Sequence, residues 1–219
     1  MNKISRRLEA IASLVEDNKK IIDIGCDHAL LDIYLIKNKK NLNIIASDIN
    51  NNALNNAKDN IKKYRVDIDI RLGNGLDVVN KDEIDTIITS GIGAHTIVGI
   101  LYNNIDKLEN VDTIIIQSNN DLHFIRQKVV KLNYYIEDEI LVLDKNIIYT
   151  IIKFKKGIRK YNKKQLLLGP VLLNKKGDLF KKKCLLEKQK IELVLKLVPK
   201  NKLLYRYKLK KKIKMYEGI

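Results

Sequence analysis

The segment with the clearest chemical potential spans residues 23–29 and reads DIGCDHA. A buried strand that runs through a small-residue turn into a helix lets backbone amides approach a ligand closely. The dinucleotide-binding form G-x-G-x-x-G is absent. The segment matches a degenerate D-x-G-x-G-x-G instead, with Asp27 and Ala29 at the later glycine positions. This pattern alone does not separate a ligand-binding turn from a structural one.

Two more segments place polar groups at the ends of predicted strands. Asp48 follows the apolar run 42–47, and a carboxylate there can accept both hydroxyls of a ribose, although it could also cap the next helix. Residues 72–76 read LGNGL. The glycines permit a tight turn, and the Asn74 amide can donate and accept hydrogen bonds as an adenine edge requires. Together the two segments predict an adenosine pocket, in the layout of S-adenosylmethionine-dependent methyltransferases.

The elements that must position these groups follow from the apolar pattern. Short apolar runs alternate with helical stretches and predict five strands, at residues 20–24, 42–47, 68–72, 84–90 and 112–117. Such alternation predicts a parallel sheet with right-handed crossovers, whose ligand lies at the carboxyl ends of the strands. Two later runs, 134–143 and 147–154, flank a turn and predict a hairpin. The expected fold class is α/β, a Rossmann-like, doubly wound, mostly parallel sheet with a terminal antiparallel hairpin.

The last part of the chain differs from the rest in charge. The net charge is +16 at pH 7; residues 1–156 hold 22 Lys and Arg against 22 Asp and Glu, whereas residues 157–219 hold 20 against 4. An AT-rich coding sequence would inflate lysine everywhere, so it does not explain a neutral first part. We therefore expect a domain boundary after residue 156. Residues 1–156, whose layout resembles that of S-adenosylmethionine-dependent methyltransferases, are expected to form one domain, and residues 157–219 a basic helical domain that binds a polyanion.

The pattern inside the basic segment indicates two helices. Asp178 is expected to cap the first, in which apolar residues recur at roughly heptad spacing from Leu179 to Val198. After a break at Pro199, a second lysine-rich helix is expected over residues 202–216. Two helices around a proline-containing turn predict an antiparallel, coiled-coil-like hairpin.

Composition argues against several classes of protein. The two cysteines, Cys26 and Cys184, have no disulfide framework or metal-binding spacing, so we expect no metal and a reducing, cytoplasmic setting. Residues 1–10 hold no apolar signal core, and no apolar run reaches about eighteen residues, which argues against secreted and membrane-spanning proteins. A soluble monomer that does not bind membranes is the resulting expectation.

Four motifs occur in order along the chain. They are ISRRLEAIA at residues 4–12, DIGCDH at 23–28, RLGNGL at 71–76 and GIG at 91–93. Together they resemble the bacterial tRNA (adenine-22 N1)-methyltransferases over residues 4–154, and the basic helical tail matches that family in architecture. The resemblance implies S-adenosylmethionine as cofactor, tRNA as partner and methyl transfer to N1 of an adenine in the D-arm region.

The chain departs from this family's pattern at two places. The family tends to read Gly-Met-Gly-Gly after the fourth strand, where residues 91–94 read GIGA, and Gln-Pro-Asn after the fifth, where residues 117–120 read QSNN. Neither change removes a group able to perform acid–base chemistry. The departures therefore concern the shape of the target-base pocket more than the reaction.

The reaction itself demands few groups. The neutral N1 of adenine carries a lone pair and needs no base, so the main task of the protein is alignment. The methylated ring is cationic, and Asp27, at the mouth of the first turn, is the candidate catalytic residue that stabilises the developing charge. Its alternative role is to bind amides of its own turn or the cofactor's amine. Arg7 reaches the cofactor carboxylate if the first helix covers the site, and otherwise faces solvent.

The remaining assignments follow from position near these turns. We assign cofactor binding to Arg7, Asp23, Gly25, Cys26, Asp27, His28, Asp48, Ile49, Asn74, Gly75, Ser90 and Gly91. We assign substrate binding to Gly93, His95, Asn119, Lys208, Lys210, Lys211 and Lys212. Either histidine of the strand-end surface, His28 or His95, could bind base or phosphate, or serve only to cap and pack. The sequence identifies no residue on which the target base would stack.

Two other functions remain open at this point. A methyltransferase for another RNA base, or for protein, would keep the same cofactor site and change only the product. A nucleic-acid-binding protein with a degenerate cofactor site would explain Asp27 and Ala29 at glycine positions, but Asp48 and Asn74 argue against it.

Overall fold

The computed structural model describes residues 4–219 and contains two compact units, Met1–Lys160 and Tyr161–Ile219. Every described strand belongs to the first unit, and the described regular structure of the second is helical. The predicted boundary after residue 156 falls at the end of the last strand, β7 (Ile147–Lys156), whereas the first unit continues through Lys160.

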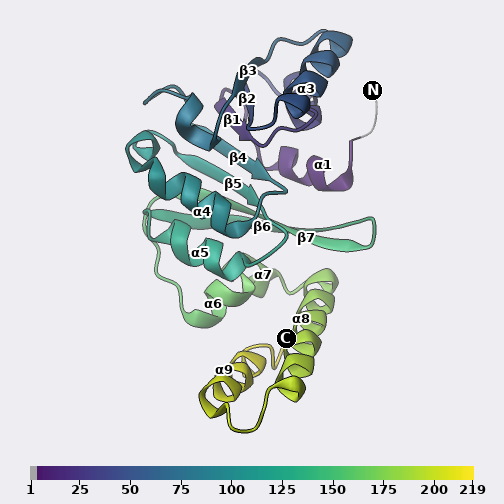
Figure 1. Ribbon diagram of the computed structural model, residues 1–219, viewed down its shortest axis with the longest axis vertical. Helices are drawn as coiled ribbons and strands as arrows, with labels where there is room; N and C mark the ends of the chain where they lie inside the picture. Colours follow the sequence, from purple (N-terminus) through teal and green to yellow (C-terminus); the bar gives the residue numbers. More distant parts are fainter. Residues whose placement is uncertain (1–3) are drawn as a thin grey trace. The chain divides into compact units, whose positions relative to one another are not determined.

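A seven-stranded sheet organises the first unit, in the order β3-β2-β1-β4-β5-β7-β6 (Figure 1). The parallel strands are β1 (Lys20–Ile24), β2 (Asn43–Asp48), β3 (Asp69–Leu72), β4 (Thr86–Ser90) and β5 (Thr113–Gln117). Strand β7 is antiparallel to β5 and to β6 (Tyr134–Asp144). The predicted fold class is confirmed. Because the order reverses between β1 and β4, the ligand of such a sheet is expected at this switch point.

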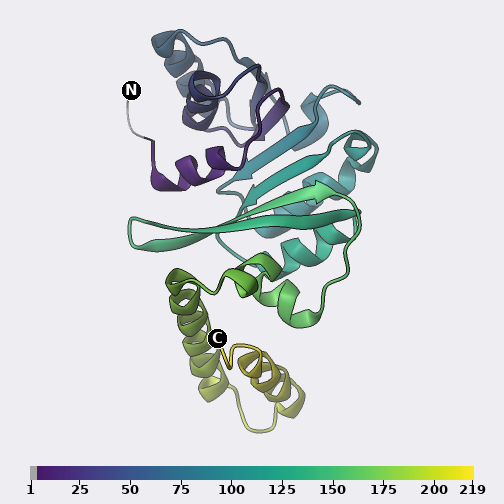
Figure 2. The ribbon, with the colours of Figure 1, turned by 180° about the vertical axis from the view of Figure 1, so that it is seen from behind.

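Helices cover both faces of this sheet (Figures 1 and 2). One face carries α1 (Arg6–Ser13), α2 (Leu30–Asn38) and α3 (Asn51–Tyr64). The other carries α4 (Ala94–Asn103) and α5 (Leu122–Val130). Two 3-10 turns that the sequence pattern did not predict are η1 (Gly75–Val78) and η2 (Ile105–Leu108).

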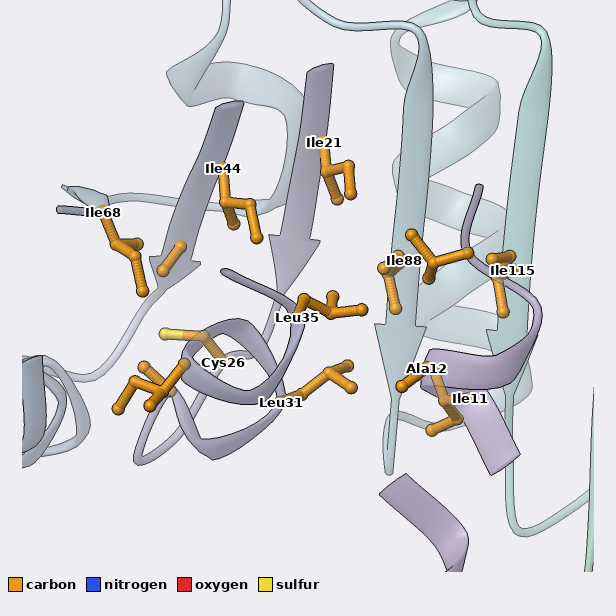
Figure 3. Packing of buried hydrophobic residues seen from close by; sticks show 14 of the residues in the cluster. Ile11, Ala12, Ile21, Cys26, Leu31, Leu35, Ile44, Ile68, Ile88 and Ile115 are labelled. Carbon is orange, nitrogen blue, oxygen red and sulfur yellow. The ribbon is translucent and has the colours of Figure 1, made fainter. Parts of the chain in front are cut away.

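The core consists largely of isoleucine from adjacent strands. On the face covered by α1 and α2, four neighbouring strands contribute Ile21, Ile44, Ile88 and Ile115 (Figure 3). The alternate strand positions are buried on the opposite face, and each buried isoleucine contributes about 1.5–3 kcal/mol. Burial on both faces is the reason that these strands read as continuous apolar runs.

Local signals explain where the helices that border the cavity begin. Helix α1 starts after Ser5, whose hydroxyl accepts a hydrogen bond from the Leu8 amide at 3.3 Å. Helix α3 starts after Asn50, whose side-chain oxygen accepts one from the Asn52 amide at 2.9 Å. The predicted alternative role of Asp48 as this cap is therefore wrong, because the cap lies two residues later.

A two-residue turn closes the terminal hairpin. Lys145 and Asn146 have φ values of 46° and 64°, as a type I′ turn requires. Asp144 was expected in the turn but still pairs with Ile147. A buried ion pair between Arg126 of α5 and Glu139 of β6, with Nε and Oε1 2.7 Å apart, ties this helix to the hairpin.

The described helices of the second unit are α6 (Lys163–Leu168), α7 (Pro170–Lys175), α8 (Asp178–Leu197) and α9 (Leu203–Lys214). The last two confirm the predicted pair of basic helices, whereas α6 and α7 were not predicted. A capping box between Asn162 and Gln165 starts α6, and Gly169, with a φ of 97°, separates it from α7.

The start and end of α8 correct and extend the prediction. Gly177 is the N-cap, and Asp178 is the first residue of α8, so the predicted capping role of Asp178 is wrong. At the other end, Arg206 of α9 donates to the carbonyls of Leu195, at 2.9 Å, and Val198, which would otherwise lack partners. Helices α8 and α9 contact each other, while the coiled-coil geometry stays a prediction.

Candidate functional site

A cavity of about 520 Å³ opens at the carboxyl ends of β1, β2 and β4. This is the switch point at which a doubly wound sheet binds its ligand. Its lining contains all the residues that were assigned to the cofactor, namely Arg7, Asp23, Gly25, Cys26, Asp27, His28, Asp48, Ile49, Asn74, Gly75, Ser90 and Gly91. The structure therefore brings these residues together, while their contacts with a ligand stay a prediction.

The same cavity is lined by residues that the sequence did not single out. Most are apolar or small and are adjacent to predicted residues, so that their pattern indicated only a core or a turn. They are Leu8, Ile24, Leu30, Leu31, Ser47, Asn50, Ala53, Gly73, Ile92, Thr96 and Ile100.

The turn after β1 keeps a glycine-like backbone without the glycines. Gly25, Asp27 and Ala29 have φ values of 78°, 51° and 52°, in the left-handed region that glycine enters most easily. The amides of Gly25 and Cys26 both donate to the Ser47 carbonyl, at 2.8 and 3.0 Å. These two amides are therefore used to join β1 to β2, contrary to the expectation that they face a ligand.

Asp23 is the most perturbed acid of the cavity. It is 3% exposed, and its Oδ1 has no hydrogen-bond partner among the described residues. Burial, followed by the negative charge of Asp48, raises the pKa of Asp23 to about 7, while Arg7 acts in the opposite direction. Burial and the charge of Asp23 likewise raise the pKa of Asp32 of α2 well above its usual value. The site thus presents an unsatisfied oxygen that a cationic ligand group would stabilise.

Asp48 is fixed by two backbone amides. Its Oδ2 accepts a hydrogen bond from the Asp27 amide at 3.3 Å, and its Oδ1 accepts one from the Asn50 amide at 2.9 Å. A carboxylate offers about four acceptor positions, so both oxygens can still accept ribose hydroxyls. The contact with Asp27 also links the turns after β1 and β2.

The turn after β3 is shaped by Gly75. Its φ is 59°, and a Cβ at this position would lie 2.7 Å from Cγ2 of Ile100. A larger residue would therefore strain the backbone and push α4. The adjacent Asn74 is exposed and does not use its side chain to cap η1, so its amide can reach an adenine edge.

Arg7 is half-buried and lies in the wall of the cavity, so the alternative of a freely solvent-facing side chain is wrong. Its Nη1 donates to Oε1 of Gln117 at 2.7 Å and lies 3.2 Å from the Ser90 hydroxyl. The same Gln117 oxygen accepts hydrogen bonds from Ser90 and from the Gly91 amide, at 3.2 and 3.1 Å. Gln117 was not predicted as a site residue, and its only sequence signal is an amide at the end of an apolar strand. The predicted contact of Arg7 with the cofactor stays a prediction.

Cys26 is buried in the cavity wall, whereas Asp27 and His28 lie at the opening of the cavity. Burial raises the pKa of the Cys26 thiol, so this cysteine is neutral and does not act as a nucleophile. Asp27 and His28 are exposed, with Oδ1 and Nε2 3.6 Å apart. This places the predicted catalytic carboxylate at the opening of the cavity, where a substrate base could approach.

The residues assigned to the substrate do not line the cavity. Gly93 is the N-cap of α4, and His95 follows in its first turn. Asn119 accepts a hydrogen bond from Nε2 of Gln117 at 2.9 Å. The four predicted lysines, Lys208, Lys210, Lys211 and Lys212, lie on α9, in the second unit, and all four are exposed.

The two departures from the family's pattern are in contact with each other. The Ser118 hydroxyl donates to the Ile92 carbonyl at 2.8 Å, and the Ala94 amide donates to Oδ1 of Asn120 at 3.1 Å. The loops after β4 and β5 are therefore joined by two hydrogen bonds. Ile92 also lines the cavity, which places the departures at its edge.

Two further features bear on the class of protein. Residues 4–219 hold no cluster of His, Cys, Asp and Glu side chains that could bind a metal ion. Within the same range, no helix is both long enough and apolar enough to cross a membrane.

Comparisons with known proteins agree with these features. The model of the tRNA (adenine(22)-N(1))-methyltransferase family matches residues 21–218. The tRNA (adenine(22)-N(1))-methyltransferase of Bacillus subtilis (strain 168) is 32% identical over 83% of this chain and 79% of its own. The Streptococcus pneumoniae protein Sp1610, solved in complex with S-adenosyl-L-methionine, is 27% identical with a TM-score of 0.88, and the match covers 98% of both chains.

A second solved structure extends the likeness to a product complex. TrmK of M. capricolum, in complex with S-adenosyl-homocysteine, is 27% identical with a TM-score of 0.84, over 97% of this chain and 96% of that one. The family match includes every residue of the cavity lining except Arg7 and Leu8, and nearly all of the second unit. The chain therefore belongs to the tRNA (adenine(22)-N(1))-methyltransferase family.

Proposed function

We propose that this protein transfers a methyl group from S-adenosylmethionine to N1 of adenine 22 in tRNA. The observation that carries the proposal is the cavity at the switch point, which combines Asp23, Asp48 and Asn74 in a chain of this family. When bound, S-adenosylmethionine supplies an activated methyl group.

The residues of the cavity fit this cofactor. Oδ1 of Asp23, to which no described residue donates a hydrogen bond, suits the cationic end of the ligand, and Arg7 suits its carboxylate. Asp48 accepts the ribose hydroxyls and Asn74 binds the adenine edge. Gly75 is required in the wall beside Asn74, because a Cβ at this position would collide with Ile100.

The protein contributes alignment and electrostatics rather than proton transfer. Adenine N1 attacks with its own lone pair, so no general base is needed. Asp27, exposed at the mouth, stabilises the positive charge that develops on the ring. Asp27 lies close to Asp48 through its backbone amide, so the same turn serves cofactor and substrate.

The second unit supplies the affinity for tRNA. The lysines of α9 neutralise phosphates, which is the usual main source of affinity for nucleic acids. The division of labour therefore follows the predicted domains, residues 1–156 for the methyl transfer and residues 157–219 for the RNA.

The backbone of the first turn favours an active enzyme over a binding protein with a degenerate site. Asp27 and Ala29 keep the positive φ values of the glycine positions that they occupy. This shape costs about 1–2 kcal/mol at Ala29 and less at Asp27, because aspartate enters the left-handed region more readily than alanine does. A turn that no longer bound the cofactor would have no reason to retain this strain.

Mapping of the product tests the proposal. The purified protein is incubated with unmodified tRNA and isotopically labelled S-adenosylmethionine, and the modified nucleotide is located by mass spectrometry. We expect N1-methyladenosine at position 22, and loss of the product when Asp27→Asn is used at equal cofactor occupancy. Methylation of free adenosine or of protein at a comparable rate would contradict the proposal.

A further inference from the structure

We propose that the target adenine stacks on the exposed imidazole face of His95, and that Phe124 holds this ring in place. This inference rests on the proposed function and adds a residue, Phe124, to which the sequence analysis gave no role. It also assigns His95 a mode of binding, stacking, in place of a hydrogen bond to base or phosphate.

The two rings form an exposed step. The centroids of His95, in α4, and Phe124, in α5, are 4.4 Å apart, with an angle of 36° between the ring planes. This separation is typical of favourable aromatic pairs. The His95 side chain is 78% exposed, and its Nε2 lies 3.9 Å from Oδ2 of Asp121. Phe124 and Asp121 thus contact one face and one edge of the imidazole, and most of the ring remains accessible.

The step lies at the rim of the cavity. Thr96, the residue after His95, lines the cavity, as does Ile92 just before α4. The hydrogen bonds of Ser118 with Ile92 and of Asn120 with Ala94 join the segments that lead into the two helices, α4 and α5, that carry the rings. The rings therefore lie in the first turns of helices that start at the carboxyl edge of the sheet, where the proposed methyl transfer takes place.

A base that leaves its own stack needs a new one. Adenine inside a folded tRNA must be turned out to be methylated, and stacking on an aromatic side chain offsets part of this cost. The Lys128 ammonium lies 5.5 Å from the Phe124 ring centroid and 5.6 Å from that of Tyr102. This places a positive charge beside the step, where the phosphates that flank a turned-out nucleotide require one.

A chemically similar pair elsewhere provides a matched control. The Lys37 ammonium lies 4.7 Å from the Tyr64 ring centroid, at the carboxyl end of α3. A helix that follows a parallel strand ends at the edge of the sheet opposite the ligand. Tyr64→Leu therefore removes an aromatic ring next to a lysine without altering the rim of the cavity.

The experiment compares full-length variants on unmodified tRNA. His95→Ala is expected to lower kcat/KM by about 5- to 150-fold, the range that corresponds to removal of one base stack. His95→Phe should restore most of this activity, because it keeps a ring and removes only the nitrogens. Tyr64→Leu should remain within about threefold of the wild type, a range that surface changes rarely exceed. The affinity for S-adenosylmethionine, measured by calorimetry, should be the same in all three.

A double-mutant cycle tests the role of Phe124 as a positioning residue. Phe124→Leu should lower kcat/KM for tRNA in the wild-type background and have no further effect in His95→Ala. Equal effects in both backgrounds, a His95→Phe variant as impaired as His95→Ala, or wild-type activity in His95→Ala would each overturn the proposal. Methylation of a base other than adenine 22 by the wild type would contradict the proposed function alone, since the variants still report stacking of whichever base is methylated.

Discussion

The two units of the chain differ in how their charged and polar groups are arranged. Residues 1–160 hold 24 Lys and Arg against 22 Asp and Glu, whereas residues 161–219 hold 18 against 4. The described cavity with its fixed polar groups belongs entirely to the first unit. A small cofactor requires enclosed groups in fixed directions, and net charge adds little to this.

The second unit shows the opposite arrangement. Three of its four acidic residues form ion pairs along α8: Asp178 with Lys181, Glu187 with Lys190, and Glu192 with Lys188. No such pair is found for the predicted lysines of α9 among the described residues. Surface charge without acidic partners is what counterion release by phosphates needs, and it requires no enclosed geometry. Cofactor affinity and tRNA affinity should therefore respond to separate sets of substitutions.

The largest effect is expected from α9. Replacement of Lys208, Lys210, Lys211 and Lys212 by glutamine should flatten the slope of log affinity against log salt by about 0.7–0.9 for each phosphate that is no longer neutralised. If all four lysines bind phosphates, tRNA affinity at about 0.1 M salt falls roughly 1000-fold. Binding of S-adenosylmethionine should not change. Filter binding across salt concentrations measures the slope, and four glutamines at exposed lysines of the first unit serve as control. An unaltered slope would refute tRNA binding by α9.

The next substitution should weaken cofactor binding and leave tRNA binding unchanged, the reverse of the result expected for α9. Asp48→Ala should weaken S-adenosylmethionine binding by about 1.5–3 kcal/mol, or roughly 10- to 150-fold, since it removes hydrogen bonds to a charged group. The salt dependence of tRNA binding should stay as in the wild type. Calorimetry on the folded variant gives the affinity. If the affinity for the cofactor is unaffected, Asp48 does not hold the ribose.

A smaller effect concerns the proton on Asp23. Its pKa is raised to about 7, so the folded protein holds this proton more tightly than the unfolded chain does. Stability should therefore be highest below about pH 4 as far as this group is concerned, and this contribution should disappear as the pH rises to 7. A cationic ligand favours the ionised form of Asp23, so binding of the cofactor should release up to one proton. Below pH 7, the affinity for the cofactor should therefore rise by up to about tenfold for each unit by which the pH increases. Calorimetry in buffers of different ionisation enthalpy measures the release, which Asp23→Asn should abolish.

The smallest expected effect concerns stability alone. Asp32 is fully buried, and its carboxylate accepts no hydrogen bond from any other residue that the structure describes. Asp32→Leu should therefore stabilise the protein by about 1–3 kcal/mol, because the cost of a buried unsatisfied group disappears. Thermal unfolding near neutral pH measures the gain, and tRNA binding should not respond. A lower melting temperature would indicate that Asp32 has a partner, such as a buried water.

Much of the fold could be predicted because its signals are local. Continuous apolar runs such as residues 42–47 exist because the strands are buried on both faces. The turn at Gly25 and the acid at Asp48 follow from their positions at strand ends. The short helices α6 and α7 were missed, since six residues are too few to show helical periodicity. The cap of α8 was misplaced by one residue, as helix ends often are.

The sequence indicated which residues share the cavity but not their contacts with one another. The residues assigned to the cofactor lie together because parallel strands bring their carboxyl ends to one edge, while their binding of the cofactor stays a prediction. Gln117 was missed because the residue that donates a hydrogen bond to its side chain, Arg7, is 110 residues away in the sequence. His95 and Phe124 are adjacent only because α4 and α5 pack side by side.

Three properties could be read from the amino-acid sequence alone: the order of the strands and main helices, the separation of charge between the two units, and the family. Each of these depends on residue types and on their spacing along the chain. The folded chain was needed to show that an oxygen of Asp23 has no hydrogen-bond partner within residues 4–219, that Arg7 lies in the wall of the cavity and that the rings of His95 and Phe124 are in contact. Desolvation, hydrogen bonding and ring contacts depend on which groups are neighbours in space, and these neighbours come from distant parts of the sequence.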